Sequence, residues 1–221
     1  MVAFELHDFK DIAFLKGIIS TFLDKNFNKL SDTSKLSTLE VLDNFIHKYT
    51  GLQKIKLTSV NIETNRIAYL TNLNDRILDD QVIVINLDKS ANADGPRILI
   101  SYLKEKYRQY QTYSVTYGNE HLTQKQLDEW KYGEKYKKVN KQYFKNKPDI
   151  YNPLERDAYI YELKQLMFLI ENFTDKKTPA RVVRSLKKKR DDVFEIIKDI
   201  EDNKHRTEDI IRSVRRQFYN Y

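Results

Sequence analysis

The sequence predicts an α+β fold in which a small sheet lies between groups of helices. Apolar residues recur at helical spacing in the first 50 residues and again after residue 95, whereas short β-branched runs lie between these regions. Helices and strands segregated along the chain are typical of the α+β class. The chain has 221 residues, which is enough for one large domain or one domain with an appendage, and its 11 Phe and 15 Tyr can supply a sizeable core.

Two helices are predicted before the sheet. The first runs from about Phe9 to Lys29, where apolar residues such as Ile12, Leu15 and Ile19 share one face. The second is predicted to begin at Ser37, because Ser37 and Glu40 have the spacing of a capping box. It is expected to stop at Gly51, which suits a left-handed helix end.

Three strands follow. Residues 54–59 alternate between polar and apolar side chains, residues 63–66 look like a turn, and residues 67–71 and 82–87 are rich in β-branched residues. The run Val82 to Ile85 is apolar on both faces, so it is predicted to be the central strand.

Helices are predicted for most of the remaining chain. They cover about residues 98–110, Gln124–Phe144 and Leu154–Phe173, and a last helical region opens at Thr178-Pro179. Residues 1–174 are predicted to form the α+β core, and residues 175–221 a basic helical C-terminal extension. Within the extension, Val193, Ile197, Ile200, Ile211, Val214 and Phe218 keep a heptad-like spacing. Such a seam either packs on its own domain or mediates dimerisation. The segment is expected to form either one long helix or a helical hairpin that turns near Asn203.

Charge and composition limit the possible functions. The net charge is +7; residues 97–147 carry +7 and residues 175–221 carry +5, so the rest is acidic by about 5. This asymmetry suggests an anionic partner or a well-solvated basic face. There is no cysteine, no apolar run of about 20 residues, and no basic start followed by an apolar segment at the N-terminus. We therefore expect a cytoplasmic protein without a membrane partner or a thiol-based site.

Two segments carry a family resemblance. Residues 103–111 read LKEKYRQYQ, and residues 152–158 read NPLERDA. Together they resemble small zincin-like metallopeptidases of bacteria and their mobile elements. In that family one helix carries HExxH followed by Gln, and a later helix opens with N/Q-P-x-E-x-D-A. Two His at i and i+4 bind one zinc ion, the intervening Glu is the general base, and the later Glu is the third ligand.

Carried over residue by residue, the resemblance implies a degenerate site. Lys104 and Arg108 stand at the two His positions, Glu105 at the general base, Gln111 at the trailing Gln and Glu155 at the third ligand. Lys and Arg side chains have no free lone pair for zinc when charged, so we expect no metal, no cofactor and no catalytic residue. Their cations are instead expected to pair with Glu105 and Glu155, which would bring the two carboxylates together.

The resemblance implies a non-catalytic pseudo-metallopeptidase that serves as a binding or inhibitory module. Zincin-like domains occur in anti-defence proteins of mobile elements, so an anti-restriction or anti-CRISPR role fits, with a host or element protein or a nucleoprotein effector as partner. The alternative from the residues alone is plainer. Residues 104–108 then form an ordinary charged helix face, and Glu155 belongs to a capping box begun by Asn152.

A second candidate region is basic and rich in tyrosine. Eleven of the 15 Tyr lie between Tyr102 and Tyr161. Tyr and Lys interleave between residues 131 and 143, which suits single-stranded nucleic acid, a protein interface, or Tyr rings that cover a core while Lys stems reach outward. A nucleic-acid-binding protein is therefore the alternative function. The candidate binding residues are Tyr132, Lys135, Tyr136, Lys137, Lys138, Lys141, Arg181, Arg184, Lys187, Lys188, Lys189 and Arg190.

Overall fold

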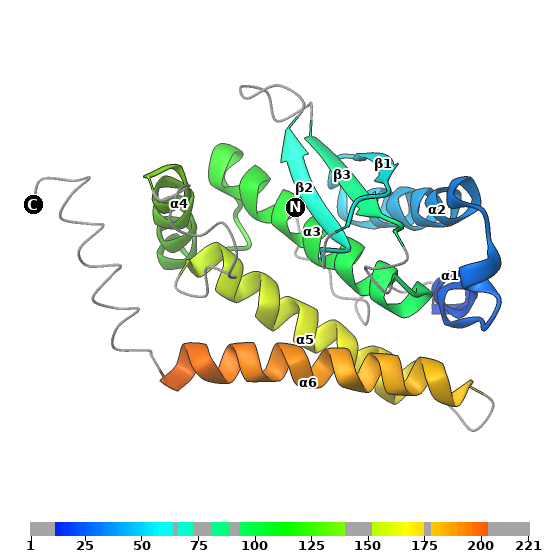
Figure 1. Cartoon of the computed structure of the whole chain (residues 1–221). Coiled ribbons are helices and arrows are strands. Elements are labelled where there is room, and N and C mark those ends of the chain that lie inside the picture. The colour runs from blue at the N-terminus through cyan, green and yellow to red at the C-terminus, as the bar shows by residue number, and fades with distance from the viewer. Residues whose placement is uncertain are drawn as a thin grey trace, which may run out of the picture.

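The computed structural model describes residues 12–63, 66–72, 81–88, 93–139, 152–174 and 178–202, and for residues 12, 72, 135–139 and 200–202 the backbone alone (Figure 1). This part of the chain is α+β, as predicted. Its elements are α1 (Ile12–Leu23), the 3-10 turn η2 (Phe27–Lys29), α2 (Asp32–Thr50), β1 (Lys56–Val60), β2 (Ala68–Asn72), β3 (Gln81–Asn86), α3 (Gly95–Tyr117), α4 (Gln124–Val139), α5 (Pro153–Phe173) and α6 (Ala180–Asp202).

The sheet has the order β1-β3-β2. β3 is central, as its apolar run predicted, and all six of its residues are buried. β1 pairs with it in parallel and β2 in antiparallel orientation, with Leu57 and Leu70 both opposite Ile83. Two parallel strands need a long connection between them, and here that connection, from β1 to β3, includes β2.

Helix α3 is the centre of the molecule. Figure 1 shows it between the sheet and the α5–α6 layer, and it packs against α1, α4, α5, α6, β2 and β3. The start of α3 lies close against the end of α1. There is no room there for a side chain, since a Cβ at Gly95 would collide with the backbone carbonyl oxygen of Phe22. Buried side chains of α3, including Ile98, Leu99 and Leu103, belong to one core that joins both layers.

A buried ion pair connects α2 to α3. Lys106 Nζ lies 2.7 Å from Asp43 Oδ1, and their side chains are 0% and 5% exposed. The same carboxylate accepts hydrogen bonds from Tyr102 Oη at 2.7 Å and from the amide of Ile55 at 3.0 Å. Lys106 also donates to the carbonyl of Gln53 at 2.8 Å. Both oxygens of the carboxylate and the ammonium group therefore have hydrogen-bond partners, as buried charges require.

Helix α6 packs along α5. Its Val182, Leu186 and Val193 are buried in the common core and Ile197 packs against that core, so the described part of the predicted apolar seam faces its own chain. Ile211, Val214, Phe218 and the turn expected near Asn203 lie outside the described residues. None of the helices in the described ranges is both long and apolar enough to cross a membrane.

Two predicted helix boundaries were wrong. α2 begins at Asp32 with Ser31 as its N-cap, whose hydroxyl accepts from the amide of Ser34 at 3.2 Å, rather than at Ser37. The first helix ends at Leu23 rather than Lys29, because the chain turns through η2 to bury Phe27. The end of α2 was predicted correctly, since Gly51 adopts a left-handed φ of 70°.

Candidate functional site

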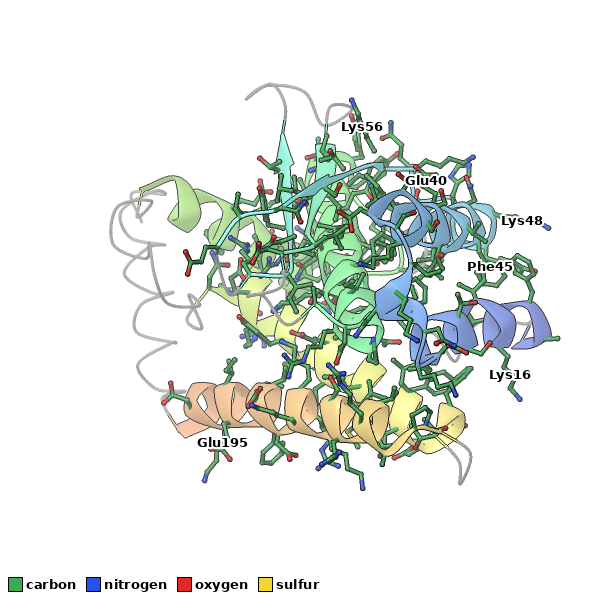
Figure 2. The ribbon with its side chains drawn as sticks, turned by 45° about the vertical axis from the view of Figure 1, so that its right-hand side comes forward. Lys16, Glu40, Phe45, Lys48, Lys56 and Glu195 are labelled. Atoms are coloured by element: carbon green, nitrogen blue, oxygen red, sulfur yellow. The ribbon has the colours of Figure 1, made fainter. Side chains whose placement is uncertain are left out.

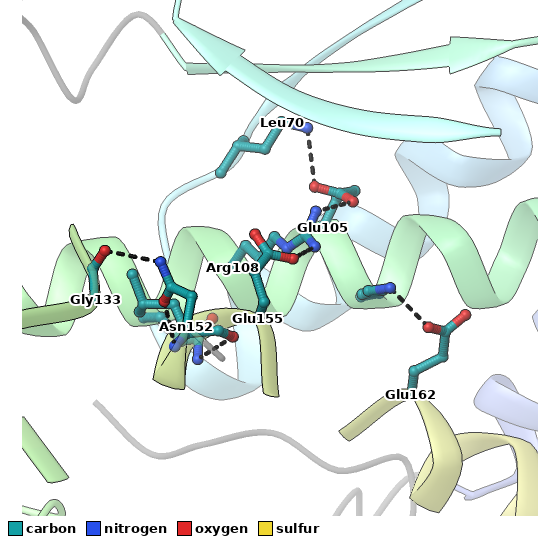
Figure 3. Close-up of polar contacts among 10 residues, drawn as sticks. Leu70, Glu105, Arg108, Gly133, Asn152, Glu155 and Glu162 are labelled. Carbon is teal, nitrogen blue, oxygen red and sulfur yellow. Dashed lines mark hydrogen bonds and ion pairs between the residues drawn. The ribbon is translucent and has the colours of Figure 1, made fainter. Parts of the chain in front are cut away.

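Arg108 bridges Glu105 and Glu155, the two carboxylates that were predicted from the sequence to lie close together. Arg108 Nη1 lies 2.6 Å from Glu105 Oε1 on the same helix, and Nη2 contacts Glu155 Oε2 on α5. Figure 3 shows the guanidinium between the two acidic side chains. All three side chains are at most 12% exposed. The expected proximity of Glu105 and Glu155, with a cation from α3 between them, is therefore confirmed.

Neighbouring contacts hold both motif segments in place. The second oxygen of Glu105 accepts a hydrogen bond from the amide of Leu70 on β2 at 3.0 Å. Gln111 Nε2 donates to the carbonyl of Leu154 at 3.2 Å, which joins α3 to the start of α5. Asn152 caps α5 by accepting from the amide of Leu154 and donates to the carbonyl of Gly133 on α4 at 2.8 Å (Figure 3). Elements from four parts of the chain therefore meet around Arg108.

Lys104 forms a second ion-pair centre one turn away. Its Nζ lies 2.9 Å from Glu162 Oε2, and the other oxygen of Glu162 lies 3.0 Å from Lys189 Nζ on α6. The ammonium of Lys104 also lies 3.3 Å from the ring centroid of Tyr159. The sequence-based expectation for Lys104 is thus corrected: its carboxylate partner is Glu162, while Arg108 alone bridges Glu105 and Glu155.

Burial and pairing set the charge states. Burial opposes the charge of Arg108, but Glu105 and Glu155 more than compensate and raise the pKa above its ordinary value. Burial lowers the pKa of Lys104 to about 8, although Glu162 favours its charged form. Burial acts to raise the pKa of Glu162, yet Lys104 and Lys189 together hold it below its usual value. At neutral pH the charges of Glu105 and Glu155 are therefore balanced by Arg108, and the charge of Glu162 by Lys104 and Lys189.

These residues do not fit a zinc ion. A zinc ion bound by Glu155 would have to share the carboxylate with the guanidinium of Arg108 and lie near the ammonium of Lys104. Neither cation offers a lone pair, and both repel a divalent metal. Within the described ranges, no group of three or more His, Asp or Glu side chains has the arrangement of a metal site.

The charged run on α3 is not an ordinary solvated face, so that alternative was wrong. Lys104, Glu105 and Lys106 are all buried. The alternative for Glu155 was right about the Asn152 cap but missed the ion pair with Arg108. Sequence reasoning also missed Glu162. Its spacing of seven from Glu155 puts both carboxylates on one face of α5, as the spacing of four does for Lys104 and Arg108 on α3.

A pH titration of stability tests the Lys104 centre. Between its native pKa of about 8 and its ordinary value of 10.5, the unfolded chain binds more protons at Lys104, so stability rises with pH. In Lys104→Met that contribution is absent. We expect wild type to gain on the order of 1–2 kcal/mol relative to the variant between about pH 7.5 and about pH 9.5. Urea unfolding at each pH measures this difference.

The exposed Lys125→Met is the matched control and should follow wild type. Glu162, Lys189, Arg108, Glu105 and Tyr159 face Lys104 and remain in both proteins, so their own titration largely cancels in the comparison. A difference between wild type and Lys104→Met that does not change with pH would contradict the prediction.

Much of the tyrosine-rich segment belongs to the core. Tyr102, Tyr110 and Tyr161 are buried, and the ring of Tyr107 stacks on Tyr161 with centroids 4.3 Å apart. Trp130 of α4 meets Tyr107 edge-on at 6.3 Å. These tyrosines pack in or against the core, but they lie outside residues 131–143, where the only tyrosine side chain that the structure describes is the half-buried one of Tyr132.

The candidate binding residues are split between surface and interior. Tyr132 is half-buried on α4; only the backbone is described for residues 135–138, and Lys141 lies outside the described ranges. On α6, the expectation of one continuous exposed cluster needs correction. Lys189 turns inward to Glu162, and half-buried Arg190 pairs with Asp191 at 2.6 Å. The exposed members are Arg181, Arg184, Lys187 and Lys188.

Known proteins add no further guide to the site. Comparison of the chain with protein-family models, curated proteins and solved structures finds no match. The functional argument therefore rests on the chemistry of the residues around Arg108 and on the surfaces of α4 and α6.

Proposed function

We propose that this protein is a non-catalytic pseudo-metallopeptidase that works as a binding or inhibitory module. The observation that carries the proposal is the Arg108 guanidinium between Glu105 and Glu155. The resemblance assigns Arg108 to the second His ligand, Glu105 to the general base and Glu155 to the third zinc ligand. A protein cation takes the electrostatic role of the metal and offers no activated water.

The proposal places the partner contacts on the basic surface. Arg181, Arg184, Lys187 and Lys188 are exposed on α6, and Lys131 is exposed beside the half-buried Tyr132 on α4. A protein partner, including a nucleoprotein of a host defence system, is the first candidate. The mobile-element context comes from the resemblance to the family and not from the geometry of the site. Single-stranded nucleic acid is the second candidate, favoured by the four exposed cations on one helix.

Two multiple variants separate these candidates. One carries Lys137→Ala, Lys138→Ala and Lys141→Ala; the other carries Tyr132→Ala and Tyr136→Ala. Binding is measured on a labelled mixed-sequence single-stranded oligonucleotide, and by capture from a host lysate with and without nuclease. If the partner is a protein, capture survives nuclease and falls mainly in the Tyr variant, because buried aromatic anchors dominate interfaces.

If the partner is nucleic acid, the Lys variant loses oligonucleotide affinity and binding weakens steeply with salt, because each neutralised phosphate releases counterions. Lys125→Ala, an exposed position at the start of α4, is the matched control and should bind normally. Full binding by both multiple variants would overturn the placement of the function on α4. About one zinc per chain in elemental analysis of the purified protein would overturn the non-catalytic assignment.

A further inference from the structure

The outer face of α6 carries an ordered row of charges. Arg181, Arg184, Lys188, Asp192 and Glu195 are all exposed, and their spacing of three, four, four and three places them on one side of the helix. This side is opposite to Val182, Leu186 and Val193, which are buried against the core. Figure 2 shows Glu195 directed away from the rest of the molecule. The row is basic in its first half and acidic in its second half.

This order of charges does not serve the helix itself. The N-terminus of a helix favours acidic side chains and the C-terminus favours basic ones. α6 has no acidic residue in its first turn and no basic residue in its last turn. The charges are therefore reversed with respect to the helix dipole, and a requirement outside this helix explains them better than helix stability does.

We infer that two copies of this chain pair through the outer faces of α6, antiparallel about a twofold axis near Arg190. In that register Arg184, six residues before the axis, lies opposite Glu195, five residues after it. Lys188, two residues before the axis, lies opposite Asp192, two residues after it. Each match holds to within one residue, or about 1.5 Å along the helix. The twofold symmetry makes every pair occur twice.

Charge complementarity selects a second copy over other occupants of this face. A nucleic acid following the whole row would meet repulsion from Asp192 and Glu195, and a purely acidic partner would meet the same repulsion. The antiparallel copy places opposite charges together along the row and also opposes the two helix dipoles. This inference goes beyond the proposed function, and pairing would cover Arg184 and Lys188, so self-association should compete with an anionic partner.

Charge-reversal variants of the full chain test the pairing. The acidic variant carries Arg184→Glu and Lys188→Asp, and the basic variant carries Asp192→Lys and Glu195→Arg. Sedimentation equilibrium of wild type at low salt, about 0.05 M, should show a monomer–dimer equilibrium that shifts to monomer at about 0.3 M. Each variant alone should self-associate at least about tenfold more weakly, because like charges then face each other. An equimolar mixture should form a heterodimer, and one chain with all four changes should recover homodimerisation.

The equimolar mixture and the fourfold variant separate electrostatic pairing from damage to the fold, because a misfolded variant would not recover dimerisation. All changes are at exposed positions, and circular dichroism checks that each variant is folded. Wild type that stays monomeric at low salt at its highest soluble concentration would overturn the inference. So would dimerisation unaffected by either variant.

The proposed function fails separately. The basic variant keeps Arg184 and Lys188, no longer covers them by pairing and lacks the repulsion from Asp192 and Glu195, so an anionic partner should bind it at least as tightly as wild type. A basic variant that is monomeric but binds no oligonucleotide would contradict the nucleic-acid candidate and leave the pairing intact.

Discussion

Replacement of Asp43 with Ala should lower the free energy of unfolding by about 3–5 kcal/mol, because it leaves the Lys106 ammonium buried without a counter-ion. Asp43 accepts from Lys106, Tyr102 and the amide of Ile55, so one substitution removes an ion pair and two hydrogen bonds. These partners lie on α3 and beside β1, so the loss should weaken the attachment of α2 to both. Urea or guanidinium unfolding measures the change.

Glu40→Ala is the matched control, since Glu40 lies one turn earlier on the exposed side of α2. It should change stability by about 0.5 kcal/mol or less. Asp43→Asn keeps a hydrogen-bond acceptor and should remain folded if the Ala variant does not. A double variant, Asp43→Asn with Lys106→Met, should be more stable than the sum of the single effects predicts. Additive effects would show that the pair contributes nothing as a pair.

Installing His at residues 104 and 108, the two positions that the resemblance assigns to zinc ligands, should create a zinc-dependent protein. In Lys104→His/Arg108→His, the two imidazoles are four residues apart on one face of α3, and Glu155 is freed from its guanidinium. Without metal, Glu105 and Glu155 lose their shared cation, so stability should fall by about 3–5 kcal/mol. Zinc at 100 times its dissociation constant should raise the free energy of unfolding of this variant by about 2.7 kcal/mol.

Arg108→Met is the control for this experiment, because it removes the same cation without adding ligands. It should lose comparable stability and show no recovery with zinc. Calorimetric titration with zinc and thermal unfolding with and without the metal give the two readouts. A folded double-His variant that binds no zinc would contradict the resemblance on which the proposed function depends, while leaving the Arg108 bridge itself unaffected.

Local signals in the sequence predicted most of the elements. The apolar run of β3 required burial on both faces, and Gly51 required a left-handed turn, so both could be read from a few neighbouring residues. The start of α2 was harder because Ser31 and Ser37 are both acceptable caps. Tertiary contacts, including the packing of the half-buried Leu36 against the core, favour the longer helix.

The candidate site was predictable only where a motif joined distant residues. The two motif segments linked Glu105 to Glu155 across 50 positions, and the structure places both on Arg108. No motif linked Lys106 to Asp43 or Lys189 to Glu162, and charged residues are expected at the surface unless a partner is known. The positions of these lysines therefore depended on packing between helices, which the sequence of one chain does not reveal.

The hydrogen bond from the Leu70 amide to Glu105 also has a consequence for the outer edge of β2. β2 is an edge strand, and unpaired amides on such an edge invite the addition of a strand from another chain. The carboxylate of Glu105 takes one of these amides, and Arg108 holds that carboxylate in place. An incoming strand would have to displace a paired anion to dock here. In the described part of the sheet, Glu105 and Arg108 thus make strand addition at the outer edge of β2 less favourable.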